Sequence, residues 1–96
     1  MCHTDVYAHV VLQAAASAGA RVPDRVSVIG IEDAIAPFLS PPLCTFDCHL
    51  HQLGVSTAAL LGQALEEPDA VPKREMIRPT FVCRASCGPA RPARSA

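Results

Sequence analysis

The chain has 96 residues, of which half are apolar, and its formal net charge is −1 at pH 7. This length allows one small domain and excludes a large enzyme, and the near-zero charge by itself predicts no polyanionic partner. The charge is uneven, because residues 1–72 hold two basic and eight acidic side chains, whereas residues 73–96 hold six basic and one acidic.

No apolar run reaches the roughly 20 residues that a membrane helix needs, and the N-terminus has no basic region followed by an apolar one. We therefore expect a cytoplasmic protein without a membrane partner. The five cysteines are an odd number, which also argues against a complete disulfide framework.

A first helix is predicted over residues 5–18. Thr4 can cap it by accepting a backbone N–H, and Asp5 favours the positive end of a helix. Small and apolar residues recur at helical spacing, namely Val6, Val10, Val11, Ala14, Ala15 and Ala18. This face is narrow, so the helix should pack closely on a sheet.

A buried strand is predicted over residues 26–30. Gly19 can close the preceding helix, and the apolar run that follows is β-branched and carries few charges. Such a run is typical of a strand covered on both faces, as in a parallel sheet. Glu32 and Asp33 come at its carboxyl end, which is where open α/β sheets bind ligands.

Two more strands and a second helix complete the prediction. The strands are expected over residues 43–46 and 76–87, and the helix over residues 50–65. Gly54 in the first turn of this helix costs roughly 1 kcal/mol relative to alanine, and close approach of another backbone would explain that cost. Residues 88–96 contain too little apolar material to order themselves.

Taken in order, these segments resemble the C-terminal part of lac-repressor-type (LacI/GalR) transcriptional regulators. The residues that carry the resemblance are V-P-x-x-V-S-V-I-G-x-E-D at 22–33, P-P-L-C-T at 41–45, Gly54, and R-x-S at 84–86. The resemblance runs from about Thr4 to Ser86. The sequence departs from the family pattern at Glu32 and Cys44, where the family prefers Asp and Thr.

The resemblance implies an α/β fold: a partial periplasmic-binding-protein-like (type I) sensor lobe, a three-layer parallel-sheet remnant with two main helices. Residues 1–48 and 76–87 would belong to the C-terminal lobe, with 76–87 as the final strand. Residues 49–67 would be a crossover helix that packs on the N-terminal lobe, and residues 88–96 a disordered tail. Because the helix-turn-helix headpiece and most of both lobes are missing from this sequence, we expect a truncated product.

The function implied by the resemblance is that of a sensing and dimerisation module without enzymatic activity or cofactor. It would bind a small effector, sugar-like or nucleoside-like, and would form a homodimer through Phe38, Leu39 and Pro41. Operator DNA would be reached only through a headpiece that this sequence lacks. One alternative is a fragment of a periplasmic sugar-binding protein of the same fold.

Three residues are candidate ligand contacts. A carboxylate can accept two hydroxyl hydrogen bonds, which suits sugars, and the family's effector-touching acid maps to Glu32. The alternative for Glu32 is a polar loop after a strand. Thr4 stands at the head of the first helix, where the family has an amide, and a plain N-cap is its alternative. Cys48 occupies a position of a polar ligand contact in the lac repressor.

A second alternative for the whole chain is a small zinc-binding domain. The possible ligands, of which zinc needs four, are Cys44, Cys48, His49, His51, Cys83 and Cys87. Against zinc, Cys44 and Cys83 fall in predicted strands, where a free cysteine behaves as a small apolar residue, so no metal is assigned. The basic residues Arg84, Arg91 and Arg94 are expected to form a solvated tail rather than a phosphate site.

Overall fold

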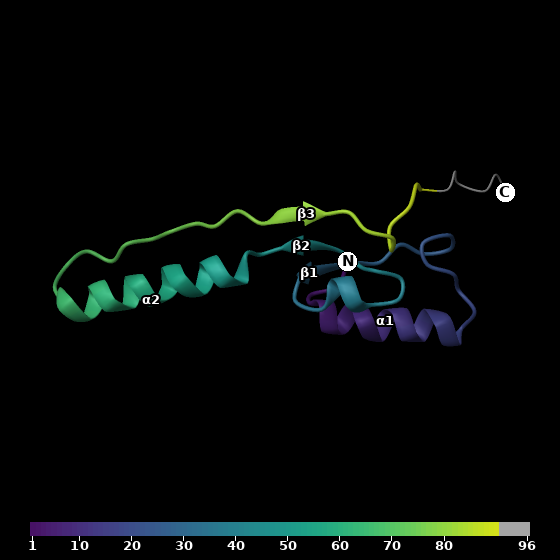
Figure 1. The fold of residues 1–96 in the computed structure, drawn as a ribbon, viewed down its shortest axis with the longest axis horizontal. Coiled ribbons are helices and arrows are strands. Elements are labelled where there is room, and N and C mark those ends of the chain that lie inside the picture. The colour runs from purple at the N-terminus through teal and green to yellow at the C-terminus, as the bar shows by residue number, and fades with distance from the viewer. Residues whose placement is uncertain (91–96) are drawn as a thin grey trace.

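A computed structural model describes residues 1–90 of the chain; residues 91–96 of the predicted tail lie outside this range. The elements in chain order are α1 (Asp5–Ser17), β1 (Ile29–Glu32), the short 3₁₀ helix η1 (Ala36–Phe38), β2 (Cys44–Asp47), α2 (Leu50–Glu66) and β3 (Thr80–Val82) (Figure 1). In the part of the chain that the structure describes, neither helix is long and apolar enough to cross a membrane.

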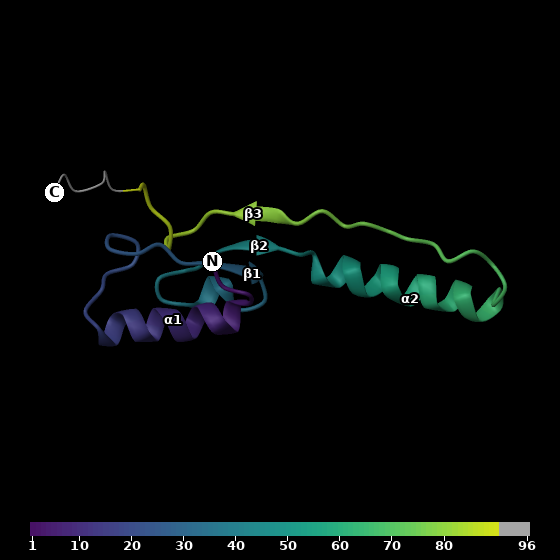
Figure 2. The same ribbon diagram turned by 180° about the vertical axis from the view of Figure 1, so that it is seen from behind.

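The three strands form one mixed sheet in the order β1-β2-β3. β1 and β2 are parallel, with Ile29 opposite Cys44 and Glu32 opposite Asp47. β3 is antiparallel to β2, with Thr45 opposite Val82, so the predicted parallel arrangement holds only for β1 and β2. The reason is the path of the chain: α2 continues outward from the end of β2, and the connection returns alongside it before entering β3 (Figures 1 and 2).

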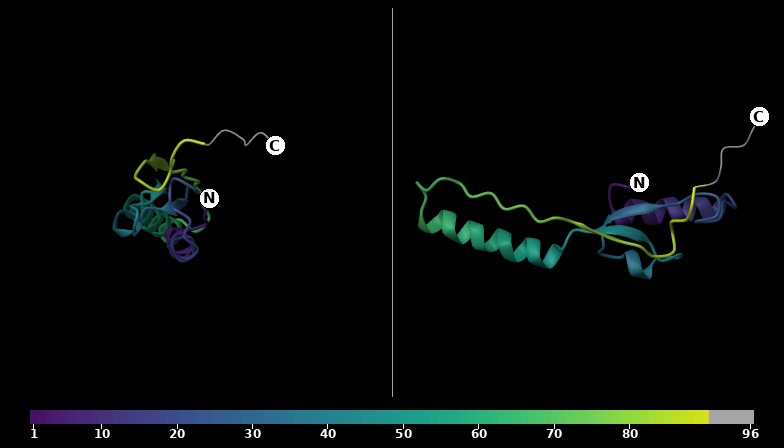
Figure 3. Two further views of the ribbon diagram at one scale, coloured as in Figure 1. Left: turned by 90° about the vertical axis from the view of Figure 1, so that its right-hand side faces the viewer. Right: turned by 90° about the horizontal axis from the view of Figure 1, so that it is seen from above.

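The molecule is elongated, with principal extents of 64 × 28 × 17 Å and a radius of gyration of 18.6 Å. A globular domain of about 100 residues has a radius of gyration of about 13 Å. The extra length comes from α2, which projects away from α1 and the sheet (Figure 3). No residue of α2 is buried, and a Cβ at Gly54 would meet nothing within 4 Å, so no other backbone of residues 1–90 approaches Gly54.

The core lies between α1 and the sheet. Its buried apolar residues are Ala8, Leu12, Val28, Ala36 and Leu43. Gly30 lies at the point of closest approach, since a Cβ there would be 2.8 Å from Leu43 Cδ2 and would also collide with the Asp5 carboxylate. The face of α1 that meets the sheet is therefore not the predicted one: Asp5, Ala8 and Leu12 are buried, whereas Val6, Val10 and Val11 are exposed.

Several boundaries differ from the prediction. The strand predicted over 26–30 occupies Ile29–Glu32, because the residues before it form a turn in which Arg25 N donates to Arg21 O at 2.8 Å. Val26 is consequently exposed. The strand predicted over 43–46 is Cys44–Asp47, and α1 ends at Ser17 with Ala18 as its C-cap.

The predicted final strand, 76–87, is reduced to Thr80–Val82. On its C-terminal side the chain leaves the regular ladder, although Ala85 N still donates to Pro42 O at 3.0 Å. The buried Ser86 hydroxyl then links β2 to the residue before β1: it accepts from Cys44 N at 2.8 Å and donates to Val28 O. The R-x-S motif at 84–86 thus closes the sheet through side chains where a backbone ladder was expected.

Candidate ligand-binding site

The carboxyl ends of β1 and β2 lie at one edge of the sheet, together with the N-terminus of α1. Glu32 is opposite Asp47 in the parallel register, and Cys48 N lies 3.4 Å from Glu32 O. The Asp5 carboxylate reaches the same edge, since its Oδ2 accepts from Ala34 N at 3.1 Å. The structure therefore brings the three predicted contacts, Thr4, Glu32 and Cys48, to the same end of the sheet.

The backbone turns sharply where these strands end. Glu32, Asp33 and His49 all have positive φ, at 116°, 64° and 52°. Side chains other than glycine rarely adopt this region, and each such residue costs of the order of 1–3 kcal/mol. Strained conformations of this kind cluster at binding sites, so their concentration at one sheet edge marks it as a candidate functional site.

Asp33 is held by an arginine. Arg84 Nη1 lies 2.8 Å from Asp33 Oδ1 and also donates to Leu43 O at 3.0 Å, and both charged side chains are less than one-fifth exposed. Because Oδ1 is buried without an aligned hydrogen bond, the contact is an ion pair. Asp33 raises the pKa of Arg84 above its ordinary value. The prediction that Arg84 belongs to a solvated tail is therefore wrong; Arg91 and Arg94 lie outside the described residues.

Glu32, by contrast, has no ion pair among residues 1–90, and no hydrogen bond to its carboxylate is found there. It is half-buried at the end of β1. Of the two adjacent acidic residues, Asp33 is paired with Arg84, whereas the Glu32 carboxylate is available to a ligand. An available carboxylate on a rigid strand end can accept hydrogen bonds from the hydroxyl groups of a ligand.

Thr4 and Cys48 are both partly engaged. Thr4 Oγ1 accepts from Tyr7 N at 3.3 Å, so the hydroxyl is an N-cap, as the simpler interpretation expected. Its O–H can still donate, because a hydroxyl has one donor and two acceptor sites. Cys48 Sγ lies 3.8 Å from Phe46 O in a weak hydrogen bond. Neither contact excludes a ligand.

Sequence reasoning missed the partner of Thr45 inside the sheet. Thr45 Oγ1 donates to Asp5 Oδ1 at 2.8 Å, and both residues are fully buried. Asp5 was expected only to favour the positive helix end. With the bond from Ala34 N, its carboxylate fastens α1 to β2 and to the turn that follows β1. Nothing in the local pattern around residue 5 distinguishes this role from that of an exposed first-turn acid.

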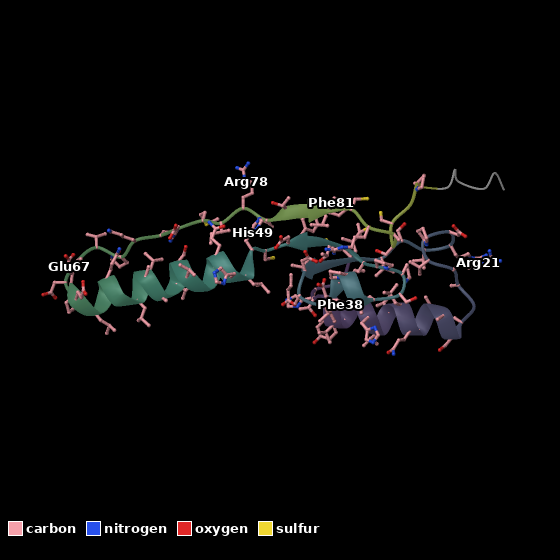
Figure 4. The ribbon with its side chains drawn as sticks, in the orientation of Figure 1. Arg21, Phe38, His49, Glu67, Arg78 and Phe81 are labelled. Carbon is pink, nitrogen blue, oxygen red and sulfur yellow. The ribbon has the colours of Figure 1, made fainter. Side chains whose placement is uncertain are left out.

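A second group of polar contacts, also missed, links the start of α2 to β3. Asp47 Oδ1 accepts from His49 N at 2.8 Å, and the His49 ring lies between Asp47 Oδ2, at 3.6 Å, and Thr80 Oγ1, at 3.0 Å. Figure 4 shows His49 at the first turn of α2, where the returning chain passes. His49 had been considered only as a zinc ligand. Within residues 1–90, no three His, Cys, Asp or Glu side chains gather to hold a metal.

The residues predicted for the dimer interface lie in different environments. Phe38 is 85% exposed and points away from the sheet (Figure 4). Leu39 is half-buried and packs against the core, and Pro41 lines a shallow hollow beside the end of α1. A second hollow lies between α2 and residues 67–73. Neither of these two hollows is lined by Glu32, Thr4 or Cys48.

Residues 1–87 match the family model of the periplasmic binding protein-like domain. The HTH-type transcriptional regulator GalR of Lacticaseibacillus casei is 35% identical over 83 residues, which cover 85% of this chain and 25% of that protein. The chain thus spans about a quarter of the length of this relative.

The chain also shares its fold with solved structures at more than 25% identity, including these two. The putative transcriptional regulator LacI from Bacillus cereus subsp. cytotoxis NVH 391-98 matches with a TM-score of 0.85 and 30% identity, over 90% of this chain and 31% of that one. A LacI family transcriptional regulator from Enterococcus faecalis V583, with bound ribose, matches with a TM-score of 0.79 and 28% identity, over 84% and 31%.

Proposed function

Since this chain belongs to the periplasmic binding protein-like domain family of LacI-type transcriptional regulators, we propose that it forms one wall of a carbohydrate-binding effector cleft. The wall is the sheet edge formed by the carboxyl ends of β1 and β2 and by the N-terminus of α1. In a full-length regulator, the opposite wall would come from the other lobe of the sensor domain.

The observation that carries this proposal is the state of Glu32. Its neighbour Asp33 is paired with Arg84 at 2.8 Å, whereas the Glu32 carboxylate has no ion-pair partner within the described residues. A carboxylate accepts hydroxyl hydrogen bonds that are roughly twice as strong as bonds between neutral groups, and two adjacent sugar hydroxyls can share its two oxygens. The ribose bound to the Enterococcus faecalis regulator supports a sugar as the ligand class.

Thr4 and Cys48 flank Glu32 in this proposal. Thr4 would donate its O–H to a ring or hydroxyl oxygen while still accepting from Tyr7 N. Cys48 would contribute mainly apolar contact, because a thiol is a weak hydrogen-bonding group. None of Thr4, Glu32 and Cys48 has an aromatic side chain. The orientation of the sugar would therefore depend chiefly on the Glu32 carboxylate.

We also propose that the intact regulator is a cytoplasmic homodimer that contacts operator DNA through a separate headpiece. The 85% exposed ring of Phe38 is the apolar group of this region that self-association would cover, with Leu39 and Pro41 beside it. Effector binding would act by having different affinities for two arrangements of the lobes, since a ligand with equal affinity for both shifts no equilibrium.

The test is Glu32→Gln in a full-length regulator that contains this chain, titrated calorimetrically with a panel of pentoses, hexoses and disaccharides. The matched control is Glu75→Gln, because Glu75 is an exposed acid on the returning segment. We expect at least a tenfold loss of sugar affinity for Glu32→Gln, consistent with about 1.5–3 kcal/mol for a hydrogen bond to a charged group. Glu75→Gln should bind like the wild type.

Operator affinity without sugar should be the same in all three proteins, because neither substitution touches the DNA-binding part. An unchanged sugar titration for Glu32→Gln would remove Glu32 from the site. A wild-type protein that binds nucleosides and no sugar in the panel would overturn the carbohydrate class while leaving the sheet edge as the site.

A further inference from the structure

Cys44 is the first residue of β2, and Cys83 directly follows the last residue of β3. The ladder between these strands pairs Phe46 with Phe81 and Thr45 with Val82. The next pair in the same register is Cys44 with Cys83. The register also continues beyond this pair, because Ala85 N donates to Pro42 O at 3.0 Å. The two cysteines are therefore bracketed by paired residues on both sides.

The geometry of an antiparallel pair suits a covalent bond between them. Alternate residues of a strand lie on the same face, and the Phe46 and Phe81 rings meet there with centroids 5.2 Å apart. Cys44 and Cys83 lie two residues away on that same face. Directly opposed residues have Cα atoms about 4.5–5.5 Å apart, within the roughly 4.4–6.8 Å that disulfides span.

The contacts of the Cys44 sulfur support this placement. Arg84 N lies 3.1 Å from Cys44 Sγ, so the sulfur is turned toward the backbone directly after Cys83. Burial raises the pKa of the Cys44 thiol, but hydrogen bonds from the Arg84 N–H and from Ser86 outweigh burial, and the net pKa lies below its ordinary value. The fold thus favours the thiolate form of Cys44 relative to an ordinary cysteine.

The second thiol has the complementary property of access. Cys83 is exposed, and both cysteines are free. The negative charge of Cys44 raises the pKa of Cys83 above its ordinary value. An oxidant from solution therefore reaches Cys83 first, whereas Cys44 is placed to react with whatever forms on the Cys83 sulfur.

We propose that Cys44 and Cys83 are a redox-active pair that forms a reversible cross-strand disulfide on exposure to a low-molecular-weight disulfide such as oxidised glutathione. The Cys83 thiolate attacks one sulfur of the oxidant, forms a mixed disulfide and releases one glutathione thiolate. The Cys44 thiolate then attacks the Cys83 sulfur and releases the second. The two protein thiols lose two electrons, glutathione disulfide gains them, and the two protons end on the released glutathione thiols.

The bond would enclose α2 and the whole returning segment in one covalent loop. At present β3 is only a three-residue strand, held to β2 by its ladder and by the contacts after it. A disulfide would fasten the residue directly after β3 to the start of β2, at the end of these two strands that lies away from α2; Phe81 marks β3 in Figure 4. This inference is independent of the proposed sugar site, because it uses neither Glu32 nor a ligand.

The test uses the full 96-residue chain, purified reduced and then equilibrated with oxidised glutathione. We expect an intact mass lower by two hydrogen atoms, recovered on addition of dithiothreitol. Trypsin cuts after Arg74 and Arg84, which separates Cys83 from Cys44 and from Cys87. A non-reducing digest should therefore contain the Cys83 peptide joined to the Cys44 peptide.

Two variants make the assignment specific. In Cys44→Ser, the first step still occurs but the second does not, so Cys83 should accumulate as the mixed disulfide with glutathione. Cys48 lies on the same tryptic peptide as Cys44. The Cys48→Ser variant should nevertheless form the disulfide as the wild type does. A Cys83–Cys87 bond, a bond between two chains, or a stable mixed disulfide on Cys83 in the wild type would each overturn the proposal.

Discussion

Arg84 Nη1 lies 2.8 Å from Asp33 Oδ1, joining the segment after β3 to the turn after β1. The two residues are far apart in sequence, yet their side chains are only 19% and 16% exposed. The pair holds Asp33 in place beside the strand end, and the neighbouring Glu32 is left available. The same arginine also binds Leu43 O, so one side chain connects three segments of the sheet region.

Removing this arginine should destabilise the fold. Arg84→Ala leaves the Asp33 carboxylate partly buried without its cation, and loss of one partner from a buried pair costs about 3–5 kcal/mol. Because both side chains retain some exposure, we expect about 2 kcal/mol, read from the midpoint of urea denaturation. Arg74→Ala is the matched control, since Arg74 is exposed on the returning segment and should change stability by less than about 0.5 kcal/mol.

A side chain at Gly30 should not fit. The φ of Gly30 is not positive, so the reason is space rather than backbone freedom. In Gly30→Ala, the new Cβ would be 2.8 Å from Leu43 Cδ2 and closer still to the Asp5 carboxylate. Overpacking of this kind costs about 1–3 kcal/mol, measurable by urea denaturation.

The control for Gly30 is Gly62→Ala in α2. A Cβ at Gly62 meets nothing within 4 Å, and alanine is a better helix former than glycine by about 1 kcal/mol. The two substitutions should therefore change stability in opposite directions. Equal effects, or a stable Gly30→Ala protein, would show that β1 and α1 are not packed as closely as the structure has them.

Ser86→Ala should be more damaging than a surface serine substitution. Ser86 is fully buried, and its hydroxyl satisfies both Cys44 N and Val28 O. Alanine leaves these two backbone groups without partners, and each unsatisfied buried group costs about 1–3 kcal/mol. We expect a loss of at least about 2 kcal/mol by the same denaturation measurement. Ser17→Ala, at the exposed end of α1, should be close to neutral.

The acidity of Cys83 should depend on Cys44. The charge of Cys44 is the main reason that the pKa of Cys83 is raised, so Cys44→Ser should lower the pKa of Cys83 toward its ordinary value. The measurement is the pH dependence of iodoacetamide alkylation at Cys83, followed on the tryptic peptide. A profile that does not move would mean that the two sulfurs are not neighbours in solution.

The two thiols should also have opposite effects on stability at alkaline pH. The pKa of Cys44 is lowered in the fold, so its stabilising contribution is present above the unfolded pKa of about 9 and is lost as pH falls through the folded value. The pKa of Cys83 is raised, so its contribution is present below about 9 and is lost as pH rises through the folded value. Denaturation of each single Cys→Ser variant across this range separates the two contributions.

Most of the element order was predictable from local pattern. The cap at Thr4, the β-branched run before Glu32 and the long apolar repeat of the second helix each depend on neighbouring residues, and all three elements are present. The boundaries moved where a tertiary contact competed with the pattern. The strand predicted to extend to residue 87 ends at Val82, since Ser86 bonds Cys44 N and Val28 O instead of continuing the ladder.

The sequence by itself determined the order of helices and strands, the position of an acidic pair at the end of β1, and the resemblance to LacI-type regulators, because all of these are properties of short neighbouring stretches. Tertiary structure alone decided that Arg84 pairs with Asp33, that Asp5 bonds Thr45, and that Cys44 and Cys83 fall at the same position of the sheet register. The partners in each pair are tens of residues apart, so their meeting depends on sheet register and on the path of the returning chain, which no local pattern encodes.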